Sequence, residues 1–490
     1  MQIWRNKLTE DFSLRAAIHP EWRTALEYPD KLLELARLHY GPLHLIMPQL
    51  MRENLSVFKQ SWPDSTLSVL FAHKSTKSPA FMRMAEHLGL GIDVASVEEL
   101  VSALAAGFRG HRIQVTGVKP NELLLLASKH GCLISVDSEP ELIRLTETLS
   151  RIKGVSARIL LRLSSPPNLT RALALRDSKF GIDPQQLGAV FDHIRSHKEL
   201  DLQGFHHHSE EQDPDNRAVL AEGLLRLLVD CYSQGFSPTI LNIGGGFRQS
   251  NLANPAAWPA FVGELERALV ENSRLPTWRE HAFGMSLSRS GTIMGRERAL
   301  GRVSSASIPA VLHAVGAARA PDGRDLRRFI LENEFQLAVE PGAALLHHCG
   351  VSLVSVIETK HRSRDYPLVV LRANALNLTQ RGRELLTDPL LIGPSSAQVG
   401  EAPVRAFLGG NLCRDSDVLS SRAVLLPRIP MEGDVLCFCN TAAYFSDFED
   451  AQPHQHPLGK KYVLSISGEG PWVQSEESYY PELERTNDCK

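Results

Sequence analysis

Four groups of residues whose types could perform chemistry each follow a short apolar run of the sequence. Lys74 follows the first run, the histidines at 206–208 end a later one, three glycines at 244–246 end another, and Glu340 ends the last. An amine, imidazoles, an anion-accepting turn and a carboxylate can cooperate only if the fold brings them together. Whether it does depends on the elements in which these runs lie.

Lys74 is the candidate nucleophile. It ends an apolar run, where we expect its ammonium to be partly desolvated and its pKa lowered, as in lysines that form Schiff bases. The alternative interpretation is a lysine whose charged end extends from the strand end into solvent.

The glycines and Glu340 favour a cofactor site. A tight turn needs only one glycine. Three consecutive glycines at 244–246 leave backbone N–H groups open to an anion such as phosphate. A carboxylate such as Glu340 can keep a pyridine nitrogen protonated, and the alternative is a helix cap or a surface acid. A lysine opposite a phosphate loop makes pyridoxal 5′-phosphate (PLP) the leading candidate cofactor.

The elements that would position these residues alternate between strand and helix. Eight apolar runs predict strands: Leu67–Ala72, Gly91–Val94, Ile113–Thr116, Leu133–Val136, Ala157–Leu163, Leu202–His206, Thr239–Ile243 and Phe335–Val339. Capping signals at Ser96 and Ser138 predict helices between them. This alternation predicts an α/β fold, a (β/α)8 TIM-type barrel, with an open doubly wound sheet as the alternative. In a barrel the strand ends share one rim, where catalytic residues lie.

The pattern changes after the last barrel strand. Short β-like runs follow, at 351–358, 366–371, 402–408, 434–439 and 462–467, and they predict a mainly β domain. We expect an N-terminal segment at 1–45 that packs with this domain, a barrel at 46–345 with an insertion near 291–325, and a C-terminal β domain at 346–490.

Composition excludes several classes of protein. The 490 residues carry 53 basic and 56 acidic side chains, so no basic field is present for nucleic acid. No apolar run approaches the roughly 18 residues of a membrane span, and the charged N-terminus predicts no signal peptide. Seven scattered cysteines favour a reducing, cytoplasmic location. Cys437 and Cys439 lack the further ligands of a zinc site, and we expect no metal.

Several motifs in a fixed order carry a resemblance to a known family. They are FAHKST around Lys74, GIDVASVEEL around Asp93, SKFGI at 178–182, GFHHH ending at His208, LNIGGGF around Gly244, EPG at Glu340, GNLCRDSDVL around Cys413 and GDVLCFCNTAAY ending at Tyr444. Together they span residues 74–444. The chain resembles the fold-type III PLP-dependent decarboxylases, the group of ornithine and diaminopimelate decarboxylases, which share the barrel of alanine racemase.

The resemblance implies a role for each matched residue. Lys74 would bind PLP as a Schiff base, His208 would stack on the pyridine ring, and Glu340 would pair with its nitrogen. Asp93 belongs to the matched cofactor-binding set, and Arg162 would lie beneath the site. Four further residues, Gly244, Gly245, Gly246 and Tyr444, would bind the phosphate. Cys413 of a partner subunit would reprotonate the substrate. Such enzymes are homodimers with shared active sites.

The chain departs from the family pattern at the phosphate site. The family usually has EPGR, and here Ala343 replaces the arginine. A Gly-Ser pair usually follows the stacking histidine, and here Ser209, Glu210 and Glu211 follow it. Two phosphate contacts are therefore missing, for which we expect Arg248 to compensate. His73 also stands where an apolar residue is usual.

The resemblance implies a PLP-dependent decarboxylase of an α-amino acid or amino-acid conjugate, acting through the Lys74 Schiff base and a quinonoid intermediate. The alternatives are an amino-acid racemase on the same fold, which would place arginine at the pyridine nitrogen, and a catalytically decayed regulatory protein. Arg414 stands where the family has an acid that receives a distal amine, so it favours a carboxylate-bearing substrate. Asp417 matches a second family acid that contacts such an amine, which leaves a diamino acid as the alternative.

Overall fold

The structure is a computed structural model of the whole chain. It describes residues 13–152, 154–173, 178–303, 306–361, 366–378, 385–394, 402–447 and 453–481, so the N-terminal residues judged for a signal peptide lie outside the described part. The described residues form two compact units. The barrel unit takes its residues from 51–248, 306–345 and 480–481, and the sheet unit from 13–50, 249–303 and 346–479.

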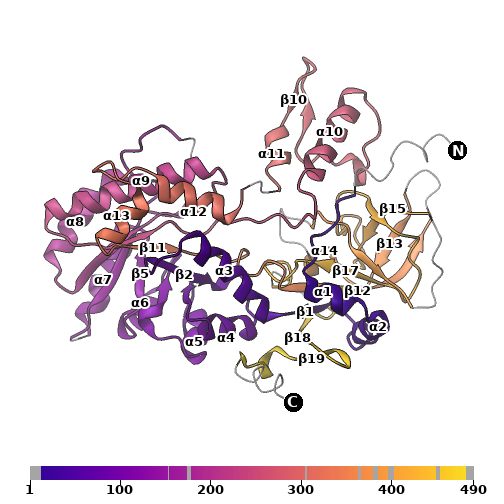
Figure 1. Cartoon of the computed structure of the whole chain (residues 1–490), viewed down its shortest axis with the longest axis horizontal. Coiled ribbons are helices and arrows are strands. Elements are labelled where there is room, and N and C mark those ends of the chain that lie inside the picture. The colour runs from indigo at the N-terminus through magenta and orange to yellow at the C-terminus, as the bar shows by residue number, and fades with distance from the viewer. Residues whose placement is uncertain are drawn as a thin grey trace. The chain divides into compact units, whose positions relative to one another are not determined.

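The barrel unit is a closed cylinder of eight parallel strands (Figure 1). The strands are β2 (Leu67–Ala72), β3 (Gly91–Val94), β4 (Ile113–Val115), β5 (Leu133–Val136), β6 (Ala157–Arg162), β7 (Leu200–His206), β8 (Ile240–Asn242) and β11 (Gln336–Val339). The cylinder closes where β11 pairs with β2, with Leu337 opposite Leu67, and with β8. The barrel prediction is confirmed, and each of the eight apolar runs overlaps one strand of the closed barrel, so the open sheet is excluded.

Helices connect the barrel strands and surround them (Figure 1). They are α3 (Met51–Ser61), α4 (Pro79–His87), α5 (Val97–Ala105), α6 (Asn121–Lys129), α7 (Glu139–Ser150), α8 (Leu187–Ser196), α9 (Pro214–Asp230), α12 (Ile308–Ala317) and α13 (Leu326–Glu332). The predicted caps are present: the Ser96 and Ser138 side chains accept the N–H groups of Glu99 and Glu141.

The sheet unit contains a nine-stranded mixed sheet. Its strands are β1 (Leu43–Ile46), β12 (Gly350–Lys360), β13 (Leu368–Leu371), β14 (Leu390–Ile392), β15 (Val404–Gly409), β16 (Val424–Leu426), β17 (Val435–Cys439), β18 (Lys460–Ser467) and β19 (Gly470–Ser475). β1 pairs antiparallel with β12 and parallel with β18. The expected β domain, formed by the C-terminal part together with the N-terminal segment, is confirmed.

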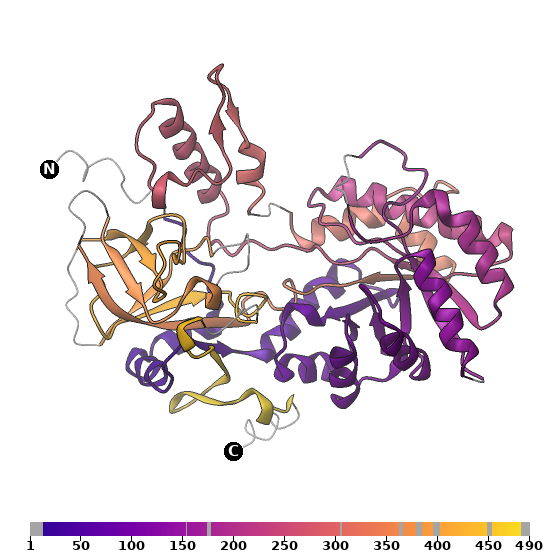
Figure 2. The ribbon, with the colours of Figure 1, turned by 180° about the vertical axis from the view of Figure 1, so that it is seen from behind.

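The long connection between β8 and α12 belongs to the sheet unit. It contains α10 (Ala257–Val270), α11 (Arg296–Leu300) and a hairpin of β9 (Ser286–Leu287) with β10 (Ile293–Met294). Figure 2 shows these helices and the hairpin gathered together. Trp258, Phe261 and Phe283 lie in their core, which also contains Leu14. The segment that leaves the barrel unit runs over 249–305, earlier at both ends than the expected 291–325.

Three short helices complete the sheet unit: α1 (Pro20–Leu26), α2 (Pro29–Arg37) and α14 (Ala375–Leu378). None of the described helices combines the length and the apolar character that a bilayer crossing requires.

Candidate functional site

The carboxyl ends of the barrel strands bring polar side chains together on one rim. Lys74 lies in a short 3-10 turn directly after β2, Asp93 lies in β3, and Glu340 follows β11. The charges of Lys74 and Glu340 both act on the carboxyl of Asp93, which places these three groups in one electrostatic cluster. This clustering is what strand ends in a closed parallel barrel produce.

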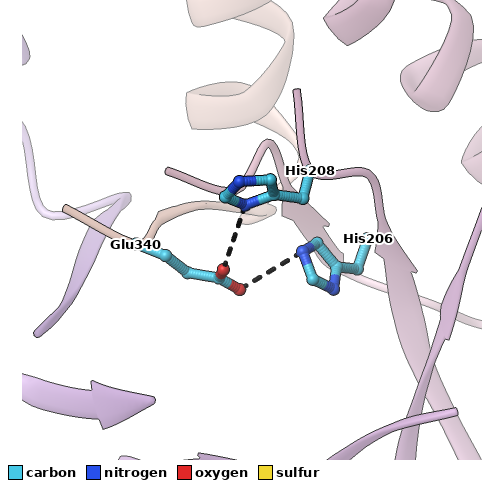
Figure 3. Close-up of side chains that lie close together, drawn as sticks. All are labelled: His206, His208 and Glu340. Carbon is cyan, nitrogen blue, oxygen red and sulfur yellow. Dashed lines mark ion pairs between the residues drawn. The ribbon is translucent and has the colours of Figure 1, made fainter. Parts of the chain in front are cut away.

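Glu340 is the centre of this rim. It is only 4% exposed, and its Oε1 accepts hydrogen bonds from Nδ2 of Asn242, at 2.8 Å, and from Nε2 of Gln114. Nε2 of His206 lies 3.3 Å from Oε1, and Nδ1 of His208 lies 3.9 Å from Oε2. Figure 3 shows both imidazoles directed at the carboxylate. A buried acid held in this way is not a surface residue or a helix cap.

The pKa values of the two acids of the rim, Glu340 and Asp93, are shifted in opposite directions. Burial would raise the pKa of Glu340, but His206, His208 and Lys74 outweigh it and hold that pKa below its usual range. Burial and the Glu340 carboxylate raise the pKa of Asp93 to about 8. At neutral pH Glu340 is therefore the ionised acid and Asp93 the protonated one.

His206 contributes no charge to this arrangement at neutral pH. Burial lowers its pKa to about 3, so the imidazole is neutral at pH 7. Its Nδ1 lies 2.8 Å from Oγ of Ser135, and its Nε2 faces Glu340. With His206 neutral, His208 and Lys74 remain to hold the pKa of Glu340 below its usual range, and the amides of Gln114 and Asn242 donate hydrogen bonds to its carboxylate.

The three histidines divide as strand alternation predicts, with His206 and His208 on one side. Nδ1 of His207 lies 3.1 Å from the carbonyl oxygen of Leu163, and burial lowers the pKa of His207 to about 4. Donor atoms of His206, His208 and Glu340 all lie within 4.8 Å of one another, a spacing that a metal ion could also use.

The glycine loop requires glycine at all three positions. Gly244 and Gly246 have φ values of 67° and 79°, in the left-handed region. A Cβ at Gly245 would lie 2.6 Å from the carbonyl oxygen of Glu340, and one at Gly246 would lie 2.3 Å from that of Ser209. The N–H of Gly245 donates to Nδ1 of His208 at 3.3 Å. The loop therefore packs closely against the rim, which a simple turn would not need.

Two predicted residues of the barrel unit have surroundings that the sequence did not indicate. Lys74 is exposed, so the expectation that its ammonium is partly desolvated is wrong for the chain alone: the strand ends before it and does not cover it. Arg162 lies 3.6 Å from Asp137, and its guanidinium lies over the ring of Phe180, 4.5 Å from the centroid. The ion pair that was the alternative interpretation of Arg162 is present.

The remaining predicted residues, Cys413, Arg414, Asp417 and Tyr444, lie in the sheet unit, and their surroundings are described within that unit alone. Cys413 and Arg414 are exposed on the loop after β15, and Nε of Arg414 donates to Oγ of Ser416 at 2.9 Å. Tyr444 follows β17 with a φ of 66°, a conformation that bulky residues rarely adopt and that accompanies functional sites.

Asp417 has a structural role within the same loop. Its side chain is buried, and its two carboxylate oxygens accept the N–H groups of Ala375, at 2.7 Å, and Leu412, at 2.8 Å. Asp415, the other neighbouring acid, pairs with Arg279 at 3.0 Å. Asp417 therefore fastens the loop that carries Arg414, and the substrate-binding prediction for it has no support from these contacts.

The sequence interpretation missed Gln114 and Asn242, which hold Glu340. Asn242 also donates to the Gln114 side chain at 2.8 Å, and its own amide oxygen accepts the N–H of Gly244 at 2.8 Å. Each is the one amide side chain in a largely apolar run, and each is less than 1% exposed. A buried amide in a barrel strand must be hydrogen-bonded, and that was the signal available.

The rim fits PLP. The ring nitrogen would face the ionised Glu340, the phosphate would lie at the glycine loop, and the aldehyde would meet Lys74. Oδ1 of Asp93 is buried and, among the described residues, has no hydrogen-bond partner. Such an unpaired polar atom is expected where a further group completes the site.

Comparisons with known proteins agree with this description. Residues 49–276 match the family described as pyridoxal-dependent decarboxylase, pyridoxal binding domain. The uncharacterized protein y4yA of Sinorhizobium fredii is 27% identical over 449 residues, 91% of this chain and 92% of that protein. The diaminopimelate decarboxylase of Bacillus subtilis is 33% identical over 259 residues, 49% of this chain and 58% of that enzyme.

Among solved structures, that of the diaminopimelate decarboxylase from M. jannaschii has a TM-score of 0.67 at 19% identity, covering 93% of this chain and 94% of that one. This likeness shows the fold. Barrel, rim lysine, glycine loop and buried glutamate together define a pyridoxal-binding barrel protein. Residues 49–276 are thus similar to the pyridoxal-binding domain of the pyridoxal-dependent decarboxylases, and the chain is similar to diaminopimelate decarboxylases, which agrees with the predicted cofactor, pyridoxal 5′-phosphate.

Proposed function

We propose that the protein is a PLP-dependent decarboxylase of an α-amino acid or amino-acid conjugate. The observation that carries the proposal is the buried carboxylate of Glu340, fixed by Gln114 and Asn242 and held below its usual pKa. An ionised acid at this position keeps the pyridine nitrogen protonated. A racemase of this fold would instead weaken the electron sink with arginine there.

Some residues of the barrel rim would bind the cofactor, and others would keep its ring nitrogen protonated. When bound, PLP supplies a conjugated ring that accepts the electron pair left at Cα as carbon dioxide departs. Lys74 would bind the aldehyde, and its exposure leaves the amine accessible. Glu340 would hold the proton on the ring nitrogen, His208 would cover one face of the ring, and Asp93 would stay protonated beside Glu340.

We extend the proposal to residues of the sheet unit. Cys413 of a partner subunit would return a proton to Cα, and Tyr444 would bind phosphate, which makes the functional form a homodimer with shared active sites. The six cysteines of the described part are free thiols, in keeping with a cytoplasmic enzyme and an available Cys413.

Arg414 supports a substrate with a distal carboxylate, or one conjugated to an acidic group. Its guanidinium is exposed, and among the described residues it has no carboxylate within ion-pair distance. A fixed positive charge beside the substrate attracts a carboxylate, which guanidinium binds bidentately, and repels the ammonium of ornithine or lysine.

Borohydride labelling and carbon dioxide release test the proposal together. The purified protein should be yellow, and borohydride should attach the cofactor to the peptide that contains Lys74. Lys74→Ala should lose both colour and labelling, whereas the matched control Lys77→Ala, which removes a lysine paired with Glu99, should keep them. Release of carbon dioxide is then screened over free amino acids and acidic conjugates. Exchange of the Cα proton without carbon dioxide release would instead show a racemase.

A further inference from the structure

A buried arginine lies behind the glycine loop. Arg217 belongs to α9, and its side chain is only 3% exposed. Nη1 donates to the carbonyl oxygens of Gly245, at 2.7 Å, and Ser209, at 3.2 Å, and Nη2 donates to that of Ile243 at 3.3 Å. Its guanidinium also lies 4.7 Å from the centroid of the Phe247 ring.

The charge of Arg217 has no counter-ion among the described residues of the barrel unit. Among the described residues, no carboxylate lies within ion-pair distance of its guanidinium. Glu211 is the one acid whose charge acts on it, but its oxygens accept the N–H groups of Gln212 and Asp213 and the amide of Asn216. Burying an uncompensated cation is costly, so such a residue is expected where an anion binds.

A small pocket that is open to solvent lies beside this guanidinium. Its lining includes Arg217, Gly246, Arg248, Glu211 and Ser307. Arg248, which the sequence suggested as the compensating cation, already pairs with Glu210 at 2.9 Å. Arg217 is therefore the cation of the loop that lacks an acid of its own.

The contacts of Arg217 also set the direction of the loop's N–H groups. In a planar trans peptide the C=O and N–H groups point in opposite directions. Holding the Gly245 carbonyl toward Arg217 therefore turns the N–H of Gly246 away from it. Gly246 packs against the same guanidinium: a Cβ there would lie 3.0 Å from Nη1 of Arg217, besides 2.3 Å from the carbonyl oxygen of Ser209.

We propose that Arg217 provides the positive charge for the cofactor's phosphate in this chain, in place of the arginine and the Gly-Ser pair that Ala343 and Ser209–Glu211 replace. Arg217 acts as a positioning residue: it orients the N–H of Gly246 and supplies charge behind it, while the N–H groups of Gly244 and Gly245 donate to Asn242 and His208. The ligand class is a phosphate monoester dianion. This inference rests on the proposed function only in requiring that PLP binds at this rim.

Affinity for PLP relative to pyridoxal, which lacks the phosphate, tests the inference without any need for turnover. Both are titrated into cofactor-free protein, with inorganic phosphate as a competitor that distinguishes free phosphate from the cofactor's own. Arg217→Gln should weaken PLP binding by about 10- to 100-fold, as removal of one charge near a dianion predicts, and should leave pyridoxal nearly unchanged. Arg217→Lys should recover part of the preference for PLP.

The matched control is Arg226→Gln, which removes an arginine of the same helix that pairs with Glu222 at 2.6 Å. It should leave the PLP-to-pyridoxal ratio unchanged. If Arg217→Gln does not fold, Glu211→Gln still tests the charge argument, because removing this nearby acid should strengthen PLP binding relative to pyridoxal. An equal loss for PLP and pyridoxal in the Arg217 variants, or an unchanged ratio in Glu211→Gln, would overturn the inference and leave the decarboxylase proposal standing. A wild-type chain that does not bind PLP would refute both.

Discussion

The protonated state of Asp93 gives a sharp prediction about the pH dependence of stability. Burial and the Glu340 carboxylate raise its pKa from 3.8 to about 8 in the folded chain. Between these values the folded chain holds a proton that the unfolded chain has lost. The free energy of unfolding therefore falls as pH rises through this window, by about 1.4 kcal/mol per pH unit from this group.

Asp93→Asn removes this dependence, because asparagine resembles the protonated acid and does not titrate. Relative to wild type, the cofactor-free variant should gain about 2 kcal/mol of unfolding free energy between pH 6.0 and 7.5. Comparison with wild type at each pH cancels the contributions of His206 and His207. Their pKa values are lowered, so they make the chain more stable as pH rises toward 6.5.

Hydrogen exchange in peptides from β3 and β5 measures this stability for the barrel unit alone. The matched control is Asp201→Asn, at an exposed aspartate in β7, which should follow wild type throughout. A difference between wild type and Asp93→Asn that stays constant with pH, or that shrinks as pH rises, would show that Asp93 is ionised at neutral pH and that the assignment of charges on the rim is wrong.

Three further predictions concern the glycine loop, the subunit interface and the substrate. Gly246→Ala should destabilise the barrel unit by about 1–3 kcal/mol in urea unfolding and weaken PLP binding, since its Cβ would overlap the Ser209 carbonyl oxygen; unchanged stability would contradict the loop packing. Mixing inactive Lys74→Ala and Cys413→Ala proteins should restore activity through one intact shared site, and proven subunit exchange without rescue would argue against sharing. Arg414→Glu should shift decarboxylation from carboxylate-bearing substrates toward ornithine, lysine or diaminopimelate; an unchanged preference would refute the charge argument.

The sequence predicted the barrel well because its signal is local. Strands buried on both faces are mostly apolar, so β5 (Leu133–Val136), with three apolar residues out of four, is recognisable without knowledge of its neighbours. The rim followed from the residue types that end such strands, as with Glu340. The hydrogen bonds that hold Glu340 could not be predicted, because Gln114 and Asn242 meet it only once the barrel has closed.

Two further features depend on packing between distant parts of the chain and could not be predicted from the sequence: the unit to which 249–305 belongs and the burial of Arg217. The connection at 249–305 has a helical pattern, but its assignment to the sheet unit depends on a core that includes Leu14, more than 200 residues earlier in the chain. Arg217 lies within an otherwise ordinary helix. Its burial beneath the glycine loop is a property of how α9 packs on β7 and β8, which no periodicity reveals.

The position of β1 determines the order in which the chain can fold on the ribosome. β1 lies between β12 and β18, so its parallel partner, which begins at Lys460, emerges about 400 residues after it. At a synthesis rate of roughly 5–20 residues per second, the amide groups of β1 on that side remain unpaired for about 20–80 seconds. An exposed strand edge is a template for mispairing between nascent chains. Production at a lower temperature, or with a holdase chaperone present, should therefore raise the yield of native protein more than supplying the cofactor does.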